Sequence, residues 1–287
     1  MARVVIFGTA FPAAEPYLED YFRSLAAQTD RDFSLVLAND GLDPELLRRL
    51  AGDLRPEIVE VRGTPAENRQ TGMARCLELG AEVLVFADCD DRHGSGRVAE
   101  ARAVLGSGRD ILCNEVLLVT GPGPGRPWLS RRFAHGRVIT AEDIREGNCL
   151  GLGNTAVRAE ILRDVPPVPA GIVAFDWALY GWLLESGRTA VFTDRARTHY
   201  RIYGENYAGI GQNTPAYLLR CLEVKRRHHG FLAEFYPAHA ERAGRYAELH
   251  DRAAGSERFL DRLFRDWTFQ SGEDVLWWEC FVEGRQA

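Results

Sequence analysis

The chain reads Val-Leu-Val-Phe-Ala-Asp-Cys-Asp-Asp from Val83 to Asp91. The apolar residues at its start are β-prone and follow one another without a polar residue, which is typical of a strand covered on both faces. Three of the last four residues are acidic, and carboxylates this close together repel one another. A hard divalent cation, which prefers oxygen ligands and often accompanies a diphosphate, would offset this charge. An acidic turn with solvated aspartates is the alternative, and the stretch alone favours neither.

The composition narrows the class of protein. The 287 residues are 46% hydrophobic, which suffices for one large domain or for a domain with an appendage. The net charge is −6 without a basic stripe, so we expect no nucleic-acid partner. Six scattered cysteines without a CxxC pair indicate free thiols and a cytoplasmic location. No apolar run is long enough to span a bilayer, and the N-terminus lacks a secretory pattern.

Strand and helix patterns alternate through the first half of the chain. Strands are predicted at residues 4–7, 33–38, 58–61, 83–86 and 110–120, and helices at 15–28, 44–54 and 66–79. This alternation is typical of βαβ units and a parallel sheet. Residues 121–127 are too rich in Gly and Pro for regular structure. A helix at 176–185 and strands at 189–192 and 198–202 follow, and only helices are predicted from about residue 214.

Three polar clusters come directly after predicted strands: Gly8-Thr9-Ala10, Asn39-Asp40-Gly41 and Asp88-Cys89-Asp90-Asp91. In open parallel sheets, ligands bind beyond the carboxyl ends of the strands, so the three clusters are expected at one edge. The turn after the first strand has one glycine and two prolines, which is not the Gly-rich amide cradle of a dinucleotide-binding domain or a P-loop. A diphosphate would then need a metal, and the acidic cluster offers its ligands.

Several motifs occur together in the order found in one family. They are Ser24-Leu25-Ala26-Ala27-Gln28-Thr29, Leu35-Val36-Leu37-Ala38-Asn39-Asp40-Gly41, Asn68-Arg69 with Gly72, Asp88-Cys89-Asp90-Asp91, Gly151-Leu152-Gly153-Asn154-Thr155-Ala156, Phe175-Asp176-Trp177, and His199-Tyr200-Arg201 with Gly204 and Asn206. Each motif is weak alone, but the ordered set is fairly specific. Through it, residues 3 to 210 resemble the family 2 glycosyltransferases.

The resemblance implies the fold and the domain organisation. We expect an α/β protein with a GT-A type, Rossmann-like nucleotide-binding sheet, mostly parallel and mixed at the acceptor side. A GT-A domain would span residues 1–210, with a nucleotide-sugar-binding half at 1–120 and an acceptor-binding half at 121–210. Residues 211–287 would form a C-terminal helical extension, which the resemblance does not explain.

The resemblance also implies a donor site. The residues expected to bind the nucleotide sugar are Thr9, Ala10, Asn39, Arg69, Asp88, Asp90, Asn154 and Arg201. Asp90 would hold Mn²⁺ or Mg²⁺, helped by Asp88 and by His199, because a late histidine completes the metal site in some relatives. The alternative for His199 is a hydrogen-bonded strand histidine, for Arg69 a surface arginine, and for Arg201 a structural salt bridge.

Asn39 departs from the family pattern, which usually has an aspartate that contacts the nucleobase at this position. An amide oxygen still accepts the ring N–H of uracil or thymine, though less strongly than a carboxylate. A UDP or dTDP donor is therefore favoured. We expect Asp40 to shape the turn rather than to contact ligand.

Asp176 is the expected catalytic base, because the family's acceptor-activating acid lies at the start of a helix in this region. The family usually has two adjacent acids there, whereas this chain has Phe175-Asp176. The alternative is a plain helix N-cap, a position that aspartate favours. Nearby aromatic residues could line an acceptor groove, although large aromatics are more often in the core; these are Trp128, Trp177, Tyr180 and Trp182.

Together these inferences predict a metal-dependent, inverting glycosyltransferase of polysaccharide biosynthesis. It would move a sugar from a nucleoside-diphosphate sugar to a hydroxyl of a saccharide or lipid-linked acceptor. The alternatives are a nucleotidyltransferase and a non-catalytic nucleotide-sugar-binding module. Trp277 and Trp278 are expected to anchor the last helix, and a peripheral membrane contact is the weaker alternative because acidic residues flank them.

Overall fold

The computed structural model describes residues 2–121, 123–203, 212–269, 278 and 281–283. The strands of its large sheet are β1 (Val4–Ala10), β2 (Phe33–Asn39), β3 (Glu57–Glu60), β4 (Val83–Phe86), β5 (Arg92–His93), β6 (Ile111–Val119), β7 (Arg126–Pro127), β8 (Val138–Ile139), β9 (Thr155–Arg158) and β10 (Ala190–Arg201). They lie in the order β3-β2-β1-β4-β9-β6-β10-β5, with β7 beside β6 and β8 beside β10.

The sheet is parallel in its first half and mixed in its second. β1 pairs in parallel with β2 and β4, and β2 with β3. β9 then runs antiparallel between β4 and β6, while β6 and β10 are parallel again. Consequently the carboxyl ends of β1, β2 and β4 meet at one edge. The predicted α/β architecture with a mixed second half is confirmed.

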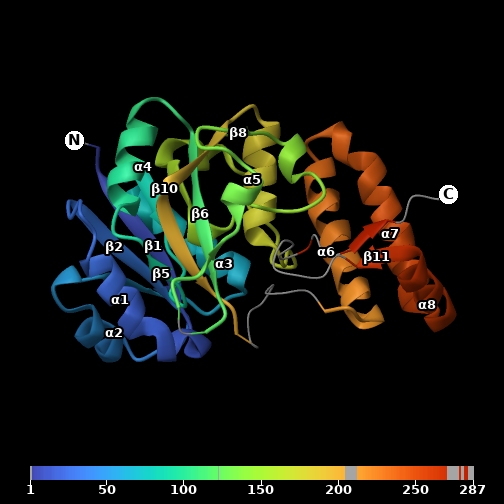
Figure 1. Cartoon of the computed structure of the whole chain (residues 1–287), viewed down its shortest axis with the longest axis horizontal. Helices are drawn as coiled ribbons and strands as arrows, with labels where there is room; N and C mark the ends of the chain where they lie inside the picture. The colour runs from blue at the N-terminus through green and yellow to red at the C-terminus, as the bar shows by residue number, and fades with distance from the viewer. Residues whose placement is uncertain (1, 122, 204–211, 270–277, 279–280, 284–287) are drawn as a thin grey trace.

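Helices cover both faces of the sheet (Figure 1). They are α1 (Leu18–Ala26), α2 (Pro44–Ala51), α3 (Pro65–Glu78), α4 (Arg97–Gly106) and α5 (Phe175–Glu185). Apolar residues of α1, α2 and α4 share one core with every second residue of β1, whereas those of α3 and α5 share the other. The apolar strands are buried because both of their faces are covered.

α3 is fixed closely against the sheet. Thr64 caps its first turn and forms a capping box with Glu67. Near the middle of α3, Gly72 lies directly on Phe7, and a methyl group at Gly72 would be 2.2 Å from a ring carbon of Phe7. Only glycine allows this approach, which sets the position of α3 and of the Arg69 side chain that projects from it.

Beyond β4 the chain differs from the prediction in several places. Residues 121–127 were expected to lack regular structure, but Arg126–Pro127 form β7, which pairs with β6. α4 was not predicted, although Val98, Ala101 and Leu105 have helical spacing and are buried. The short strand β9 was also missed. The strands predicted at 189–192 and 198–202 are one strand, β10, whose register shifts between Thr193 and Arg197. Its polar residues at 194–197 read as a loop because they lie at this irregularity.

The C-terminal part packs beside α5 (Figure 1). It contains α6 (Pro215–Ala233), the single-turn helix η7 (Pro237–His239), α7 (Ala240–Gly255) and α8 (Glu257–Asp266). The expectation of helices alone is wrong, because β11 (Trp267–Phe269) and β12 (Phe281–Glu283) form an antiparallel pair. Trp277 lies outside the described residues, whereas Trp278 is buried.

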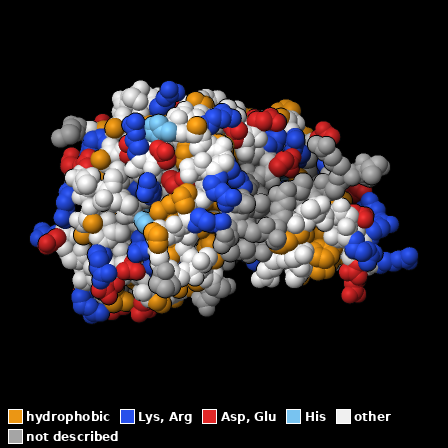
Figure 2. Space-filling model, viewed as in Figure 1, with side chains coloured by type: hydrophobic (Ala, Val, Ile, Leu, Met, Phe, Trp, Pro, Cys, Tyr) orange, Lys and Arg blue, Asp and Glu red, His pale blue; other side chains and the backbone are white. Residues whose placement is uncertain are grey.

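The surface carries both signs of charge. On the face drawn in Figure 2, Lys and Arg side chains are interspersed with Asp and Glu side chains. Among the described residues, no helix combines the length and the apolar character that a bilayer span requires.

Candidate functional site

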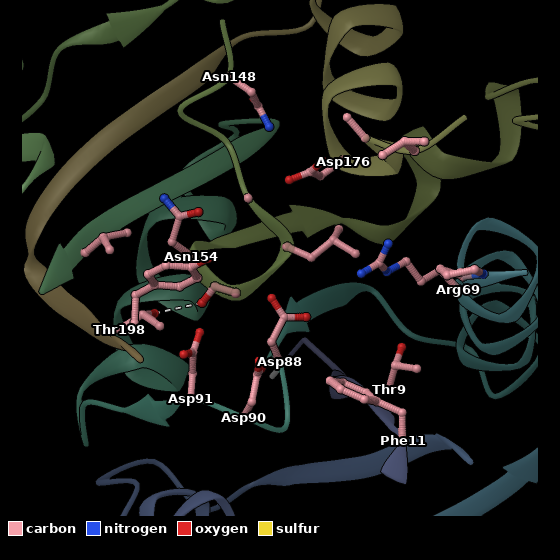
Figure 3. A pocket seen from close by; sticks show the side chains of 18 of the residues that line it. Thr9, Phe11, Arg69, Asp88, Asp90, Asp91, Asn148, Asn154, Asp176 and Thr198 are labelled. Atoms are coloured by element: carbon pink, nitrogen blue, oxygen red, sulfur yellow. Dashed lines mark hydrogen bonds between the residues drawn. The ribbon is translucent and has the colours of Figure 1, made fainter. Parts of the chain in front are cut away.

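A cavity of about 320 Å³ opens at the edge where β1, β2 and β4 end. Figure 3 shows its lining side chains converging from both halves of the sheet and from α3 and α5. The polar residues that line it are Thr9, Asp40, Asn68, Arg69, Asp88, Asp90, Asp91, Asn148, Asn154, Asp176, Thr198, Tyr200 and Tyr203. The topology therefore brings together motifs that are almost 200 residues apart in the sequence.

The acidic cluster lies at the floor of this cavity. Asp88, Asp90 and Asp91 follow β4, and their carboxylates point into the cavity in Figure 3. Gly153 closes over them, because a methyl group there would be 2.8 Å from Oδ2 of Asp88 and 3.1 Å from Oδ2 of Asp91. The two carboxylates are therefore gathered on one small backbone surface rather than extended into water.

Burial and mutual repulsion make the carboxylates hard to ionise. Burial, followed by the charge of Asp90, raises the pKa of Asp88 to about 6. Burial also raises the pKa values of Asp90 and Asp91. In Asp91, Oδ1 accepts the backbone N–H of Arg201 at 2.8 Å, and Oδ2 is buried without a hydrogen-bond partner among the described residues.

A buried arginine beneath the cluster offsets part of this charge. Arg97 is 3% exposed, and its guanidinium donates to Asn114 and to the carbonyl oxygens of Phe86 and Thr155. Burial lowers the pKa of Arg97 to about 10, while the charge of Asp88 acts in the opposite direction. Arg97 was not among the predicted site residues. An arginine four residues before the buried Ala101, on the apolar face of α4, does indicate a buried cation.

The donor set fits a hard divalent cation. Carboxylate oxygens are the ligands that Mg²⁺ and Mn²⁺ prefer, and the unpartnered Oδ2 of Asp91 and the raised pKa of Asp88 both indicate negative charge that protein cations leave uncompensated. Asp88 and Asp90 would hold such an ion, as the sequence predicted, with Asp91 close by.

Tyr203 is a contact that the sequence did not reveal. Its hydroxyl donates to Oδ2 of Asp90 at 2.8 Å, and its ring lies 5.1 Å from that of Tyr17. The hydrogen bond stabilises the charged form of Asp90 and so lowers its pKa against the effect of burial. An aromatic residue just beyond the end of β10 gives no distinctive signal in a single sequence.

Asp176 lies on the opposite wall of the cavity. It occupies the second position of α5, where Ala174 is the N-cap, so the alternative that Asp176 is the N-cap is wrong. Oδ1 accepts the N–H of Trp177 at 2.8 Å. Burial raises the pKa of Asp176, and the positive charge of Arg69 lowers it.

Arg69 is the cation that faces both acidic walls. It extends from α3 toward the centre of the cavity in Figure 3, and its guanidinium lies 5.9 Å from the ring centroid of Phe175. Its charge lowers the pKa values of Asp88, Asp90 and Asp176. Both acidic walls therefore share one arginine, and the alternative of a plain surface residue does not describe its position.

The structure places the residues after β2 differently from the prediction. Asn39 is fully buried and does not line the cavity. Its amide oxygen accepts the N–H of Leu42, and its NH₂ group donates to Leu42 and Glu60. Asn39 thus closes the turn, and Asp40, which was expected only to shape the turn, lines the cavity instead. Ala10 is likewise buried beside it, whereas Thr9 reaches the cavity.

The expected metal role of His199 is at odds with the geometry. Thr198 and Tyr200 line the cavity, and because side chains alternate along a strand, His199 of β10 points to the other side. Burial lowers the pKa of His199, followed by the positive charges of Arg92 and Arg197. A cationic neighbourhood of this kind disfavours a metal ion, so we leave His199 out of the candidate site.

Arg201 and Asn154 have structural contacts as well. Arg201 pairs with Asp20 at 3.1 Å and lies over the ring of Tyr17, so its side chain does not line the cavity. Asn154 lines the cavity while its NH₂ group donates to the carbonyl oxygens of Asn114 and Cys149. The predicted nucleotide contact remains a prediction for both residues.

Aromatic residues contribute less than expected. Three of the four candidates for an acceptor groove are buried in the core and Trp182 packs against it: Trp128, Trp177, Tyr180 and Trp182. Trp278 lines the cavity instead, close in the structure to Tyr217 of α6, with ring centroids 6.5 Å apart. The C-terminal part therefore supplies one wall of the site.

The chain is similar in fold to several solved structures. No family model and no curated protein matches the sequence. Among solved structures, the chain is similar to S. aureus TarS 1–349 in complex with UDP-GlcNAc, with a TM-score of 0.61, 15% identity and 96% of each chain covered.

Two further solved structures share this similarity. The mannosyltransferase PcManGT from Pyrobaculum calidifontis, in complex with GDP-Man and Mn²⁺, gives a TM-score of 0.52 at 18% identity, over 92% of this chain and 78% of that one. GalNAc-T7 with UDP, GalNAc and Mn²⁺ gives 0.57 at 14% identity, over 88% of this chain and 55% of that one. At such identities the similarity establishes a shared fold.

Proposed function

Because the chain has the GT-A fold of nucleotide-sugar transferases, we propose that it is a metal-dependent glycosyltransferase with inverting stereochemistry. The observation that carries this proposal is the arrangement of charge in one cavity. An acidic cluster at the end of β4 faces Asp176 at the start of α5, and Arg69 lies toward both. A cation-bound diphosphate and a separate base on the opposite wall are what a sugar transfer requires.

The donor would bind along the strand ends. Asp88 and Asp90 are the residues that would hold Mn²⁺ or Mg²⁺, with Arg69 near the diphosphate and Thr9 and Asp40 near the nucleoside. When bound, the ion supplies Lewis-acid stabilisation of the charge that develops on the leaving diphosphate. A carboxylate at Asp40 would accept the ring N–H of uracil or thymine, so a UDP or dTDP donor remains favoured although Asn39 is buried.

In the proposed transfer step, Asp176 accepts the proton of the acceptor hydroxyl. The acceptor oxygen forms a bond to the anomeric carbon from the face opposite the diphosphate, and the bond between that carbon and the diphosphate oxygen breaks. The hydroxyl proton passes to the Asp176 carboxylate, and the nucleoside diphosphate leaves with the bonding electrons. Burial raises the pKa of Asp176, and the positive charge of Arg69 acts against this and favours the ionised form that a base requires.

The two alternatives predict different behaviour. A nucleotidyltransferase normally has a basic, Gly-rich loop after its first strand, and residues 8–16 contain no Lys or Arg. A non-catalytic binding module would hold the nucleotide sugar without releasing nucleoside diphosphate, either to an acceptor or to water.

Asp176→Asn tests the proposal. We expect UDP and Mn²⁺ to bind with near-normal affinity by calorimetry, whereas sugar transfer falls by on the order of 10²–10⁴ because general-base assistance is lost. Asp164→Asn, which changes an exposed carboxylate, is the matched control. Normal turnover in Asp176→Asn would contradict its assignment as the base.

Asp90→Ala tests the metal site separately. This variant should lose the metal-dependent binding of UDP in the same calorimetric experiment.

The proposal extends to the acceptor, the cellular location and the domain organisation. We propose a hydroxyl of a saccharide or lipid-linked acceptor, consistent with a role in polysaccharide biosynthesis. We also propose a cytoplasmic location, because the five cysteines of the described residues are buried and form no disulfide. A division into a GT-A domain at 1–210 and an extension at 211–287 is also a proposal, and Trp278 makes the extension part of the site.

A further inference from the structure

Three buried imidazoles meet in the C-terminal part of the molecule, away from the acidic cluster. His228 and His229 lie on α6, and His239 ends η7. Their exposed fractions are 1%, 0% and 2%. Each offers a ring nitrogen that lies within 4.8 Å of the other two. Imidazoles are rarely gathered so closely in a core without a shared ligand or a hydrogen-bond network that uses all of their nitrogens.

The hydrogen bonds fix which nitrogens carry lone pairs. Nε2 of His239 lies 3.1 Å from Oε1 of Glu185, and a carboxylate only accepts, so this nitrogen carries the proton. Nδ1 of His239 therefore has a free lone pair, which faces Nδ1 of His229 at 2.8 Å. A proton or a cation must lie between these two nitrogens.

Two further ring nitrogens lack hydrogen-bond partners. Among the described residues, Nδ1 of His228 and Nε2 of His229 are buried and make no hydrogen bond. A purely structural network would satisfy such groups, because leaving one unpaired costs about 1–3 kcal/mol. Burial lowers the pKa values of all three histidines, which favours their uncharged form.

We propose that His228, His229 and His239 bind one divalent transition-metal ion of the Zn²⁺ class. Neutral imidazole is a favoured ligand for this class of ion. Glu185 accepts from the distal nitrogen of His239, which is the contact that commonly orients a metal-binding imidazole. This proposal does not depend on the proposed transferase activity, because the oxygen-rich cluster at Asp88 and Asp90 favours different ions.

The site needs only a small rearrangement. Zn–N bonds of about 2.0–2.1 Å in a tetrahedral site place ligand nitrogens about 3.3 Å apart. Pairs as far apart as 4.8 Å must therefore close by about 1.5 Å, and the two Nδ1 atoms at 2.8 Å must open by about 0.5 Å. Gly181 of α5 leaves room beside His228, because a methyl group there would be 3.1 Å from its Cε1. The described residues offer no fourth His, Cys, Asp or Glu ligand, so we expect water in the remaining position.

The nearby charges are balanced. Lys225 lies 3.9 Å from Glu146, which also pairs with Arg242 at 2.6 Å. Arg145 lies 2.6 Å from Glu142 and 3.5 Å from Glu185, so three carboxylates face the three cations. Each cation that packs near the imidazoles thus has a carboxylate beside it, and the dication would not enter a region of unopposed positive charge.

The ion would join the C-terminal helices to the wall that carries Asp176. The ring of His228 stacks on Trp177 with centroids 3.9 Å apart, and Trp177 follows Asp176 on α5. Glu185 lies at the other end of the same helix. An ion at the three imidazoles would therefore fix α6 and η7 against both ends of α5.

A cobalt titration tests the proposal directly. In an Asp88→Asn/Asp90→Asn double variant, which lacks the two carboxylates proposed to hold a metal ion in the cavity, we expect metal-free protein to bind one equivalent of Co²⁺. The complex should show the intense visible absorption of four-coordinate cobalt, lose it when Zn²⁺ is added, and melt at a higher temperature than the metal-free protein.

Matched histidine variants locate the ion. His229→Gln and His239→Gln, placed in the same double variant, should lose the absorption and the rise in melting temperature. His250→Gln, which changes a histidine of α7 outside the cluster, should keep both. A folded double variant that binds no stoichiometric Co²⁺ would overturn the proposal even if the histidine variants fail to fold, and so would absorption that persists in His229→Gln and His239→Gln.

Discussion

At the scale of single residues, the cavity depends on how charges are placed rather than on how many there are. Asp88 follows β4 and Asp176 begins α5, and each ionises more easily because Arg69 is near. Arg97 lies beneath Asp88 and offsets its charge from the protein side. The acidic stretch is therefore tolerated partly through protein cations, and we expect a metal ion to offset the remainder.

Arg69→Gln should shift the pH dependence of transfer. The positive charge of Arg69 lowers the pKa of Asp176, so its removal raises that pKa further above the usual aspartate range. A base works only when deprotonated, and the acidic limb of the kcat profile at saturating Mn²⁺ should move to higher pH. Arg75→Gln, on the outer side of the same helix, should leave the limb in place. An unmoved limb in Arg69→Gln would separate Arg69 from Asp176.

Gly153→Ala should weaken binding of UDP with Mn²⁺ by roughly tenfold or more, equivalent to about 1.4 kcal/mol. The new methyl group would lie 2.8 Å from Oδ2 of Asp88, and a short aspartate side chain has little freedom to withdraw. Calorimetry measures the loss. Gly106→Ala meets no atom within 4 Å and is the control, and equal affinity in the two variants would show that Gly153 does not constrain the cluster.

At the scale of elements, one close contact between helix and strand positions Arg69. α3 reaches its place because Gly72 has no side chain and can lie on Phe7 of β1. The capping box at Thr64 fixes where the helix begins. Together they determine the direction in which Arg69, one turn before Gly72, enters the cavity.

Gly72→Ala should destabilise the protein by about 1–3 kcal/mol, because the added methyl group overpacks a dense core against Phe7. Gly244→Ala, in the exposed middle of α7, should instead stabilise it by about 0.5–1 kcal/mol because alanine favours the helix. Urea unfolding of both variants measures the two signs. Equal shifts would contradict the close contact.

At the scale of the whole molecule, the site is shared between the sheet and the C-terminal part. Trp278 lines the same cavity as Asp176 and lies beside Tyr217 of α6. Helix α6, which lies beside Trp278, packs on α5, whose first turn holds the proposed base. The C-terminal part is therefore a component of the site and not only an appendage.

Trp278→Ala should reduce transfer to an acceptor more than it reduces donor hydrolysis. Removal of the indole opens the wall near α5 to water while the acidic cluster stays intact. The ratio of sugar transferred to nucleoside diphosphate released measures this effect. Trp182→Ala, which removes a partly buried tryptophan outside the cavity, controls for lost packing. An unchanged ratio would exclude Trp278 from the acceptor side.

The parallel half of the sheet could be predicted from the sequence, because buried strands and amphipathic helices leave local patterns of apolar residues. The sequence also predicted that the residues after β1 and β4 would meet, since parallel strands end at one edge. Asp88 and Asp90 were predicted from this edge, Arg69 and Asp176 were predicted from the family resemblance, and all four line the cavity.

The side of an element that a residue faces, and the residues that lie beneath it, depend on how distant segments pack in the folded protein. This packing buried Asn39 and turned His199 away from the cavity, it placed Arg97 under the acids, and it brought Tyr203 to Asp90. These outcomes depend on strand alternation relative to distant segments and on contacts between residues far apart in the chain. No local pattern encodes such contacts, because the partners become neighbours only when the sheet and its helices have assembled.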